Sequence, residues 1–229
     1  MVLRSAMTVD RKVLFVHGLE SGPHGNKSRA LAQAGYRVAA EEMPCGEKRM
    51  KRDPVVVAAA IATLGFGAAA TARWGLRGLA SSAAMIAAAR EPAKRAITRR
   101  MFERSVAVQL RALREHRPDV VVGSSFGGAV TLELLRRRAW AGPTVLLCPA
   151  HELVCEREGR AWVSFAIEHP ESVLLVHARE DEVVAYEHSV RLARELGVEL
   201  VTVSDDHQLT ANATSEGLAR WVERAARGA

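Results

Sequence analysis

A short run of β-branched residues leads directly into a serine flanked by glycines. Residues 120–122 are all valine, and Gly-Ser-Ser-Phe-Gly-Gly follows them. This pattern predicts a buried strand, a sharp turn and a helix, because so tight a turn needs residues of minimal bulk two positions before and two positions after its central serine. Only Ser125 has glycine at both positions, since a valine stands two residues before Ser124. The alternative is a glycine-rich turn that is capped by a serine.

In the predicted turn, the hydroxyl of Ser125 projects above the sheet, beside the unpaired N–H groups at the start of the following helix. These N–H groups would stabilise negative charge that develops on an attacked carbonyl oxygen. Ser125 is therefore a candidate nucleophile.

Six short apolar segments are predicted to be strands, and segments with helical periodicity separate most of them. Most of these strands lack polar alternation, which is typical of strands buried on both faces of a parallel sheet. The alternation of strands and helices indicates an α/β fold with a doubly wound, mainly parallel sheet and right-handed crossovers. A functional site in such a sheet lies at the carboxyl ends of the strands. The predicted strands are residues 12–17, 36–41, 119–124, 144–149, 172–178 and 198–204.

The regular alternation is interrupted between the second and third predicted strands. Residues 55–72 contain no charged side chain, and a second alanine-rich run covers residues 78–89. We therefore predict that residues 51–100 form an inserted apolar helical cap or hairpin, within an α/β core made of residues 1–50 and 101–229.

Glycine inside a helix costs about 1 kcal/mol relative to alanine, so Gly65 and Gly67 are expected to bend or interrupt the first arm of the insertion. The insertion leaves the sheet just before the strand that leads to Ser125, and it should emerge near the carboxyl ends of the strands. Residues 54–90 are accordingly predicted to cover the mouth of the site and to give it an apolar wall.

The composition excludes several classes of protein. The chain has 229 residues, of which 48% are hydrophobic, and this is enough for one sizeable core. Residues 1–10 lack the apolar segment of a secretory signal, so a cytoplasmic location is expected. Cys45, Cys148 and Cys155 lack the spacing of a disulfide framework or a zinc site, and they are expected to be reduced thiols. The net charge of +6 comes without a nucleic-acid recognition motif, and only 5% of the residues are aromatic, so nucleic acid is not expected as a partner.

A serine nucleophile needs a histidine that takes its proton and a carboxylate that orients this histidine. His207 is the histidine that lies directly after the last predicted strand, where the topology requires the base. Asp181, at the carboxyl end of the fifth predicted strand, is the preferred acid, while Glu180 and Glu182 in the same loop stay open as rival carboxylates. The remaining histidines are expected to be structural or exposed to solvent.

Two backbone N–H groups are candidates for an oxyanion hole, the pair of donors that stabilises the developing negative charge. One belongs to Phe126, directly after Ser125, and the other to Leu19, in the loop after the first predicted strand. His17 lies in that loop too, and it is expected to shape the loop while His207 acts as the base.

Residues 12–19, the turn at 123–128, the loop at Asp181 and His207 together resemble the alpha/beta-hydrolase superfamily, in particular its small bacterial serine esterases. The order serine, aspartate, histidine along the chain is the one found in that fold. The resemblance implies a catalytic triad of Ser125, Asp181 and His207. It also implies that the triad cleaves a small ester or thioester substrate through an acyl-enzyme, without a cofactor.

The resemblance further implies that the N–H groups of Leu19 and Phe126 form the oxyanion hole. Two residues depart from the pattern of the superfamily: Ala178 stands where glycine is common, and Ala185 stands where proline often occurs. Both departures concern the loop that carries Asp181, and neither concerns the nucleophile.

A non-catalytic binding protein of the same fold is the competing interpretation, because a fold alone does not establish chemistry. Basic residues flank the two arms of the predicted insertion, at 48–52 and at 90–100. Residues 54–90 are therefore a candidate for peripheral contact with an anionic membrane surface, or for a homodimer interface. The uncharged run of residues 55–72 barely reaches the length of a membrane-spanning helix, so spanning is not expected.

Overall fold

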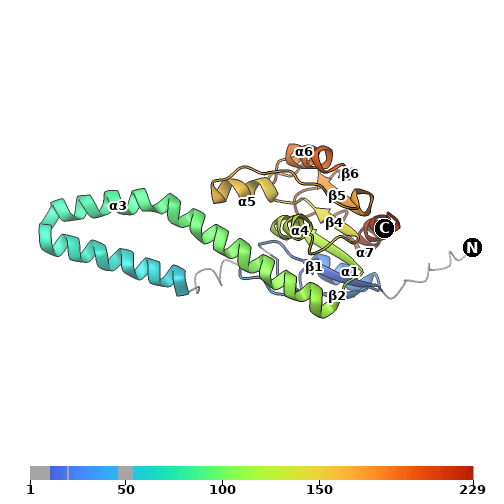
Figure 1. Ribbon diagram of the computed structural model, residues 1–229, viewed down its shortest axis with the longest axis horizontal. Helices are drawn as coiled ribbons and strands as arrows, with labels where there is room; N and C mark the ends of the chain where they lie inside the picture. The colour runs from blue at the N-terminus through green and yellow to red at the C-terminus, as the bar shows by residue number, and fades with distance from the viewer. Residues whose placement is uncertain (1–10, 20, 46–53, 229) are drawn as a thin grey trace, which may run out of the picture.

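The computed structural model describes residues 11–19, 21–45 and 54–228 (Figure 1). Its centre is a sheet of six parallel strands in the order β2-β1-β3-β4-β5-β6, which confirms the predicted doubly wound parallel sheet. The strands are β1 (Lys12–Val16), β2 (Arg37–Ala39), β3 (Val120–Ser124), β4 (Thr144–Leu147), β5 (Val173–Ala178) and β6 (Glu199–Val203). The helices are α1 (Asn26–Gln33), α3 (Pro54–His116), α4 (Phe126–Arg136), α5 (His151–Glu158), α6 (Tyr186–Leu196) and α7 (Ser215–Arg227), and a short 3-10 turn, η1 (Pro170–Ser172), precedes β5.

Helices cover both faces of the sheet, because alternate residues of each strand point to opposite faces. In β1, Val13 and Phe15 pack in one hydrophobic cluster with residues of α1 and α7. Leu14 and Val16 pack in a second cluster with residues of α3 and α4. α6 lies on the same face as α4, where it packs against β4 and β5. The continuous apolar runs that predict the strands are thus explained by burial on two sides.

The register of the strands aligns their carboxyl ends along one edge of the sheet. Val16 of β1 pairs with Gly123 of β3, and Ser124 of β3 pairs with Leu147 of β4. Leu147 in turn pairs with Val176 of β5. The segments that follow these strands therefore meet at one edge, which is where a functional site is expected in a parallel sheet.

The long connection between β2 and β3 differs from its prediction in where it bends. Within α3 the backbone leaves helical geometry at Gly75, with φ 57° and ψ −139°. Gly65 and Gly67, which the sequence predicts as the bend, lie in helical backbone, so that prediction is wrong. A helical glycine costs only about 1 kcal/mol, which good helix formers around it offset, whereas a reversal of the chain needs a residue that tolerates positive φ.

The two arms of α3 form a hairpin that projects away from the sheet (Figure 1). The second arm continues without a break into the part of α3 that packs on β1 and α4, and this part sets the direction of the hairpin. The arms extend beyond α5, and the described residues that line the cavity beside the His207 loop include none of the hairpin, so the structure does not place the predicted cap there. Among the described residues, no helix combines the length and the apolarity that crossing a membrane requires.

The hairpin turn leads to a prediction about two glycines. Gly75→Ala should destabilise the hairpin by about 1–3 kcal/mol, because a side chain at this positive φ is strained. Gly65→Ala is the matched control, and it should stabilise the helix by about 0.5–1 kcal/mol, since its added Cβ meets no atom within 4 Å. Amide hydrogen exchange in the first arm, followed by mass spectrometry, should be faster than in the parent for Gly75→Ala and slower for Gly65→Ala. Equal exchange in the Gly75→Ala variant and the parent would show that the chain does not reverse at Gly75.

Candidate active site

Ser125 occupies the turn between β3 and α4 in a backbone conformation that few non-glycine residues adopt, with φ 54° and ψ −117°. Glycines on both sides make this turn feasible. A Cβ at Gly123 would overlap the side chain of Thr131, and a Cβ at Gly127 would overlap the carbonyl of Val16. The glycine pattern of the sequence therefore reflects direct contact between the turn, α4 and β1.

Backbone hydrogen bonds hold Ser125 in this conformation. Its N–H donates to the carbonyl of Leu147 at 2.8 Å. Its own carbonyl accepts from the N–H groups of Ala129 and Ala150, at 3.2 Å and 3.0 Å. The turn is thus fixed by β4, by the first turn of α4 and by the start of α5.

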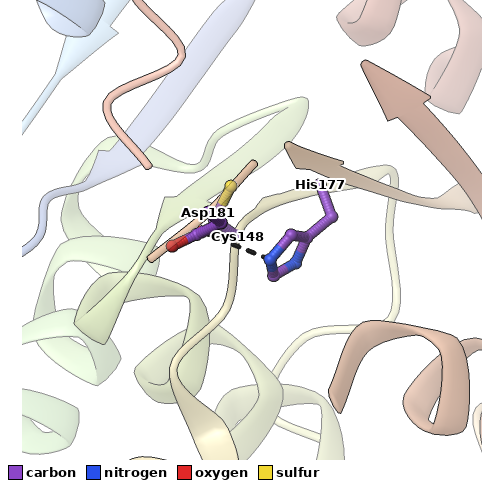
Figure 2. Close-up of side chains that lie close together, drawn as sticks. All are labelled: Cys148, His177 and Asp181. Carbon is purple, nitrogen blue, oxygen red and sulfur yellow. Dashed lines mark ion pairs between the residues drawn. The ribbon is translucent and has the colours of Figure 1, made fainter. Parts of the chain in front are cut away.

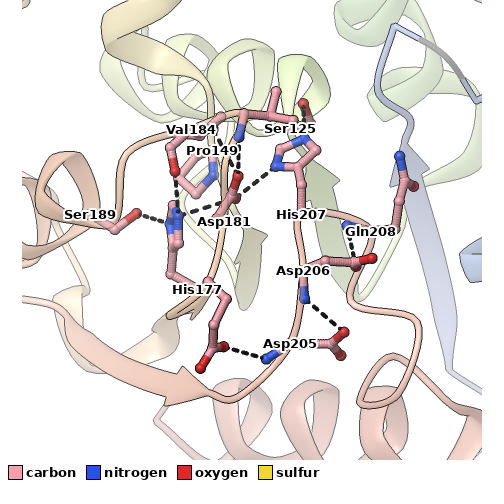
Figure 3. A network of polar contacts seen from close by, with 12 residues as sticks. Ser125, Pro149, His177, Asp181, Val184, Ser189, Asp205, Asp206, His207 and Gln208 are labelled. Carbon is pink, nitrogen blue, oxygen red and sulfur yellow. Dashed lines mark hydrogen bonds and ion pairs between the residues drawn. The ribbon is translucent and has the colours of Figure 1, made fainter.

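The structure brings Ser125, His207 and Asp181 together in one hydrogen-bonded chain (Figure 3). Nε2 of His207 lies 3.0 Å from Oγ of Ser125, and Nδ1 of His207 lies 2.7 Å from Oδ2 of Asp181. A carboxylate can only accept, so Nδ1 carries the proton and Nε2 is free to accept from the serine hydroxyl. The three residues follow β3, β5 and β6, whose carboxyl ends lie at the same edge of the sheet.

The carboxylate of Asp181 is fully buried and has a partner on each oxygen. Oδ1 accepts from the N–H groups of Val183 and Val184, both at 2.8 Å, while Oδ2 faces His207 and lies 3.2 Å from Nε2 of His177. Burial alone would raise the pKa of Asp181, but hydrogen bonds from His177, His207 and Val184 hold this pKa well below its usual range. Asp181 is therefore ionised at neutral pH.

The two rival carboxylates lie elsewhere. Glu180 accepts hydrogen bonds from the hydroxyl of Ser204 and from the N–H of Asp205, at 3.1 Å and 2.9 Å. Glu182 is exposed to solvent. Asp181 is thus the carboxylate of this loop that reaches His207.

The two predicted oxyanion donors belong to Phe126, directly after the serine, and to Leu19, directly after a glycine that packs against it. Phe126 is the first residue of α4, and a helix leaves the N–H groups of its first turn without partners inside the helix. Leu19 follows Gly18, where an added Cβ would lie 3.3 Å from Cβ of Ser125. His17 is buried and shapes this loop: its Nδ1 donates to the carbonyl of Gly18 at 2.8 Å, and its Nε2 accepts from the N–H of Met43 at 3.3 Å.

The loop that carries His207 is organised by an aspartate that the sequence did not single out. Oδ2 of Asp205 accepts from the N–H groups of Ala211 and Asn212 and from the side-chain amide of Asn212, at 2.9–3.1 Å. The adjacent Asp206 accepts from the N–H of Gln208 at 2.9 Å. An Asp-Asp pair directly before the histidine was the available signal, because aspartate commonly bonds backbone N–H groups a few residues further on.

A cavity of about 690 Å³ lies beside the loop after His207. It is formed by the segment between β1 and α1 on one side and by Gln208 and Thr210 on the other. Lys27 joins the two sides, because its ammonium donates to the carbonyl of Gln208 at 2.7 Å. The described residues that line it include Ser21, His24, Asn26, Lys27, Gln208 and Thr210.

Among the described residues, Cys148, His177 and Asp181 form a group of three side chains that could hold a metal ion, with ligand atoms within 4.8 Å of one another (Figure 2). Metal binding requires the thiolate form of cysteine. Burial raises the pKa of the Cys148 thiol to about 12, so the thiol stays protonated. His177 and Asp181 are already engaged with each other and with protein groups. This group therefore does not fit a metal site.

No family model matches the chain, and no curated protein matches it in sequence. Solved structures do resemble it in fold. Alpha/beta hydrolase domain-containing protein 10 from mouse has a TM-score of 0.59 at 12% identity, with 96% of this chain and 90% of that chain covered. A protein from Xanthomonas campestris that is assigned to the alpha/beta hydrolase superfamily has a TM-score of 0.52 at 19% identity, with 95% and 96% covered. An alpha-beta serine hydrolase homologue from Coxiella burnetii has a TM-score of 0.52 at 16% identity, with 96% and 85% covered.

The close contact at Gly127 leads to a prediction about stability. Gly127→Ala should lower the free energy of unfolding by about 3 kcal/mol or more, because the added Cβ would overlap backbone atoms of β1 that cannot move without breaking the sheet. Gly22→Ala is the matched control, since its Cβ meets no atom within 4 Å and should change the stability little. Thermal unfolding measures both variants. A Gly127→Ala variant that melts with the parent would contradict the described turn.

Proposed function

We propose that this chain, which has the fold of the alpha/beta-hydrolase superfamily, is a serine hydrolase that cleaves a carboxylic ester or thioester through an acyl-enzyme on Ser125. The observation that carries the proposal is the chain of hydrogen bonds from Oγ of Ser125 through His207 to a buried, ionised Asp181. Such an arrangement makes a serine hydroxyl reactive, since it supplies a base within hydrogen-bonding distance and an anion that stabilises the protonated base.

In the proposed reaction, His207 takes the proton of Ser125 as Oγ attacks the carbonyl carbon of the substrate. The tetrahedral oxyanion lies between the N–H groups of Leu19 and Phe126, and each such donor contributes about 3–4 kcal/mol of transition-state stabilisation in other hydrolases. The protonated His207 then gives its proton to the departing alcohol or thiol. Water, deprotonated by His207, attacks the resulting acyl-enzyme and releases the acid and the free Ser125.

The cavity beside His207 supports a small-molecule substrate. Its volume of about 690 Å³ lies within the usual range for sites that bind small ligands. Gln208, which follows His207 in the chain, forms part of its wall, so this cavity is the candidate site for a part of the substrate that does not react.

We expect Ser125→Ala to abolish both labelling by a fluorophosphonate and hydrolysis of a short p-nitrophenyl ester. Asp181→Asn and His207→Ala should each lower kcat by several orders of magnitude, and the double variant should lose little more than either single one, because the members of a triad act as a unit. Ser124→Ala and Glu182→Gln are the matched controls, and they should stay close to the parent. Labelling and kcat are measured side by side, with thermal unfolding as a check of the fold.

If Ser125→Ala is labelled as well as the parent, the nucleophile assignment is wrong and the non-catalytic binding protein becomes the better interpretation. A large loss in Glu182→Gln together with a nearly active Asp181→Asn would move the acid to the neighbouring position.

We also propose that the hairpin of residues 54–90 joins two copies of this chain. Its described large apolar side chains are exposed, and those of Ile61 and Trp74 are 65% and 60% accessible to solvent. The others are Val57, Phe66, Met85 and Ile86. A helix that is apolar on most sides is normally covered. A second hairpin, related by a two-fold axis, would cover both copies at once in a four-helix arrangement.

The tip of the hairpin favours a protein partner over insertion into lipid. Arg73 and Arg77 flank the turn at Gly75, and the guanidinium of Arg73 lies 5.8 Å from the ring centroid of Trp74. Inserting the hairpin tip first would take these charges into the hydrocarbon, which is costly. Pairing with a second hairpin leaves both arginines in water.

The parent protein should elute with the mass of two chains in size-exclusion chromatography with light scattering, and Phe66→Glu combined with Met85→Glu should elute with the mass of one. Val163→Glu is the matched control, because Val163 is an exposed apolar residue outside the hairpin and should leave the mass unchanged. The parent should also stay in the soluble fraction when it is floated with phosphatidylserine vesicles at low salt. A parent that is monomeric and floats with the vesicles would replace the dimer with a membrane contact.

A further inference from the structure

His177 is a second buried histidine beside Asp181, and the proposed reaction does not use it. It is a residue of β5 with no exposed surface, in a strand whose other members are all apolar. Its Nε2 lies 3.2 Å from Oδ2 of Asp181 and 3.0 Å from the carbonyl oxygen of Val184, while its Nδ1 lies 2.6 Å from Oγ of Ser189 on α6. Figure 3 shows the imidazole on the side of Asp181 away from His207.

The partners of His177 determine where its proton lies. The Val184 carbonyl and the Asp181 carboxylate can only accept, so Nε2 must carry a proton and donate it. The hydroxyl of Ser189 can donate to Nδ1, so the neutral form of His177 satisfies all three partners without adding a buried charge. Burying an imidazole without partners is unfavourable, and here every polar atom of the ring has one.

We propose that His177 is a positioning residue, whose Nε2–H fixes the carboxylate of Asp181 toward His207 and withdraws part of its negative charge. This inference rests on the proposed function, because it gives His177 a part in setting how strongly His207 binds a proton. The geometry supports this inference, since His177 closes the turn from Asp181 to Val184. Val184 donates its N–H to Oδ1 of Asp181. The Nε2–H of His177 is shared between the carbonyl of Val184 and Oδ2 of Asp181. The carboxylate is thereby held at both oxygens before it meets His207 at 2.7 Å.

Among the described residues, few other ionisable groups lie around His177 and Asp181. The thiol of Cys148 interacts with the Asp181 carboxylate and stays protonated. The ring of Tyr186 packs edge-on against His177, with centroids 5.7 Å apart, and its hydroxyl is paired with Oγ1 of Thr202 at 2.7 Å. The acid limb of the pH profile for kcat/KM therefore reports mainly on His207, on Asp181 and on His177, which shares Oδ2 of Asp181 with His207.

The experiment compares His177→Asn with His177→Gln. Glutamine places an amide N–H near the position of Nε2 and should keep the bond to Asp181, whereas the shorter asparagine brings its amide only to the position of Nδ1. His177→Gln should retain kcat/KM within about threefold and keep the acid limb of the parent. His177→Asn should lose about 10–100-fold in kcat with little change in KM. Its acid limb should move to higher pH, because an Asp181 carboxylate without the hydrogen bond from His177 stabilises protonated His207 more strongly.

Ser189→Ala tests the same network from its far end. Removing the donor to Nδ1 loosens His177 but leaves Nε2 in place, so a loss of a few-fold and a smaller shift in the same direction are expected. A folded His177→Asn variant with the kcat and the acid limb of the parent would overturn the proposal, and so would a His177→Gln variant as impaired as His177→Asn. If His177→Asn fails to fold, an acid limb that is unchanged in Ser189→Ala overturns it.

A measurement without turnover separates this proposal from the proposed function. The proton between Nδ1 of His207 and Asp181 should give a low-field ¹H NMR signal in the parent, and this signal should shift in His177→Asn and stay in place in His177→Gln. If the low-field signal differs between His177→Asn and the parent, but the parent neither reacts with fluorophosphonate nor hydrolyses esters, the positioning by His177 is supported and the hydrolase is rejected. An active, labelled parent whose low-field signal is the same in His177→Asn would reject the positioning alone.

Discussion

The tight approach of the turn at Ser125 to β1 is the contact on which the rest of the site depends. The backbone of Gly127 lies against the carbonyl of Val16, which leaves no room for a side chain. The loop after β1 lies beside the serine at Gly18, where an added Cβ would be 3.3 Å from Cβ of Ser125. The same turn starts α4, so one backbone arrangement positions both the candidate nucleophile and the candidate oxyanion donor of Phe126. Asp181 and His207 need only follow neighbouring strands to complete the site.

Much of the fold, and the residues that meet in the candidate site, could be predicted from the sequence, because both depend on local pattern and topology. Uninterrupted apolar runs identified the buried strands, and the glycine spacing singled out Ser125. The two departures from the superfamily pattern also have physical explanations. Ala185 has φ −56°, which is the value that proline would impose, and Ala178 is not among the residues with positive φ, so neither position demands the residue that is common there.

The direction of the hairpin and the partners of Asp181 could not be predicted, because they depend on contacts between segments far apart in the chain. Gly65 and Gly75 look alike in sequence, and only the reversal of the chain decides which of them takes a positive φ. The sequence shows His177 only as a residue of a buried strand. Its contact with Asp181 depends on the turn from Asp181 to Val184, which follows that strand. Asp205 similarly organises the His207 loop only because the folded loop brings the N–H of Asn212 to its carboxylate.

Ser125 and Gly75 have nearly the same backbone conformation, with φ of 54° and 57°. At the hairpin tip a glycine occupies this conformation without strain, whereas in the turn a serine occupies it under strain of about 1–3 kcal/mol. A glycine in place of Ser125 would therefore relax the turn while removing the hydroxyl. At this residue a stable backbone favours glycine, whereas the proposed chemistry requires the hydroxyl of a serine.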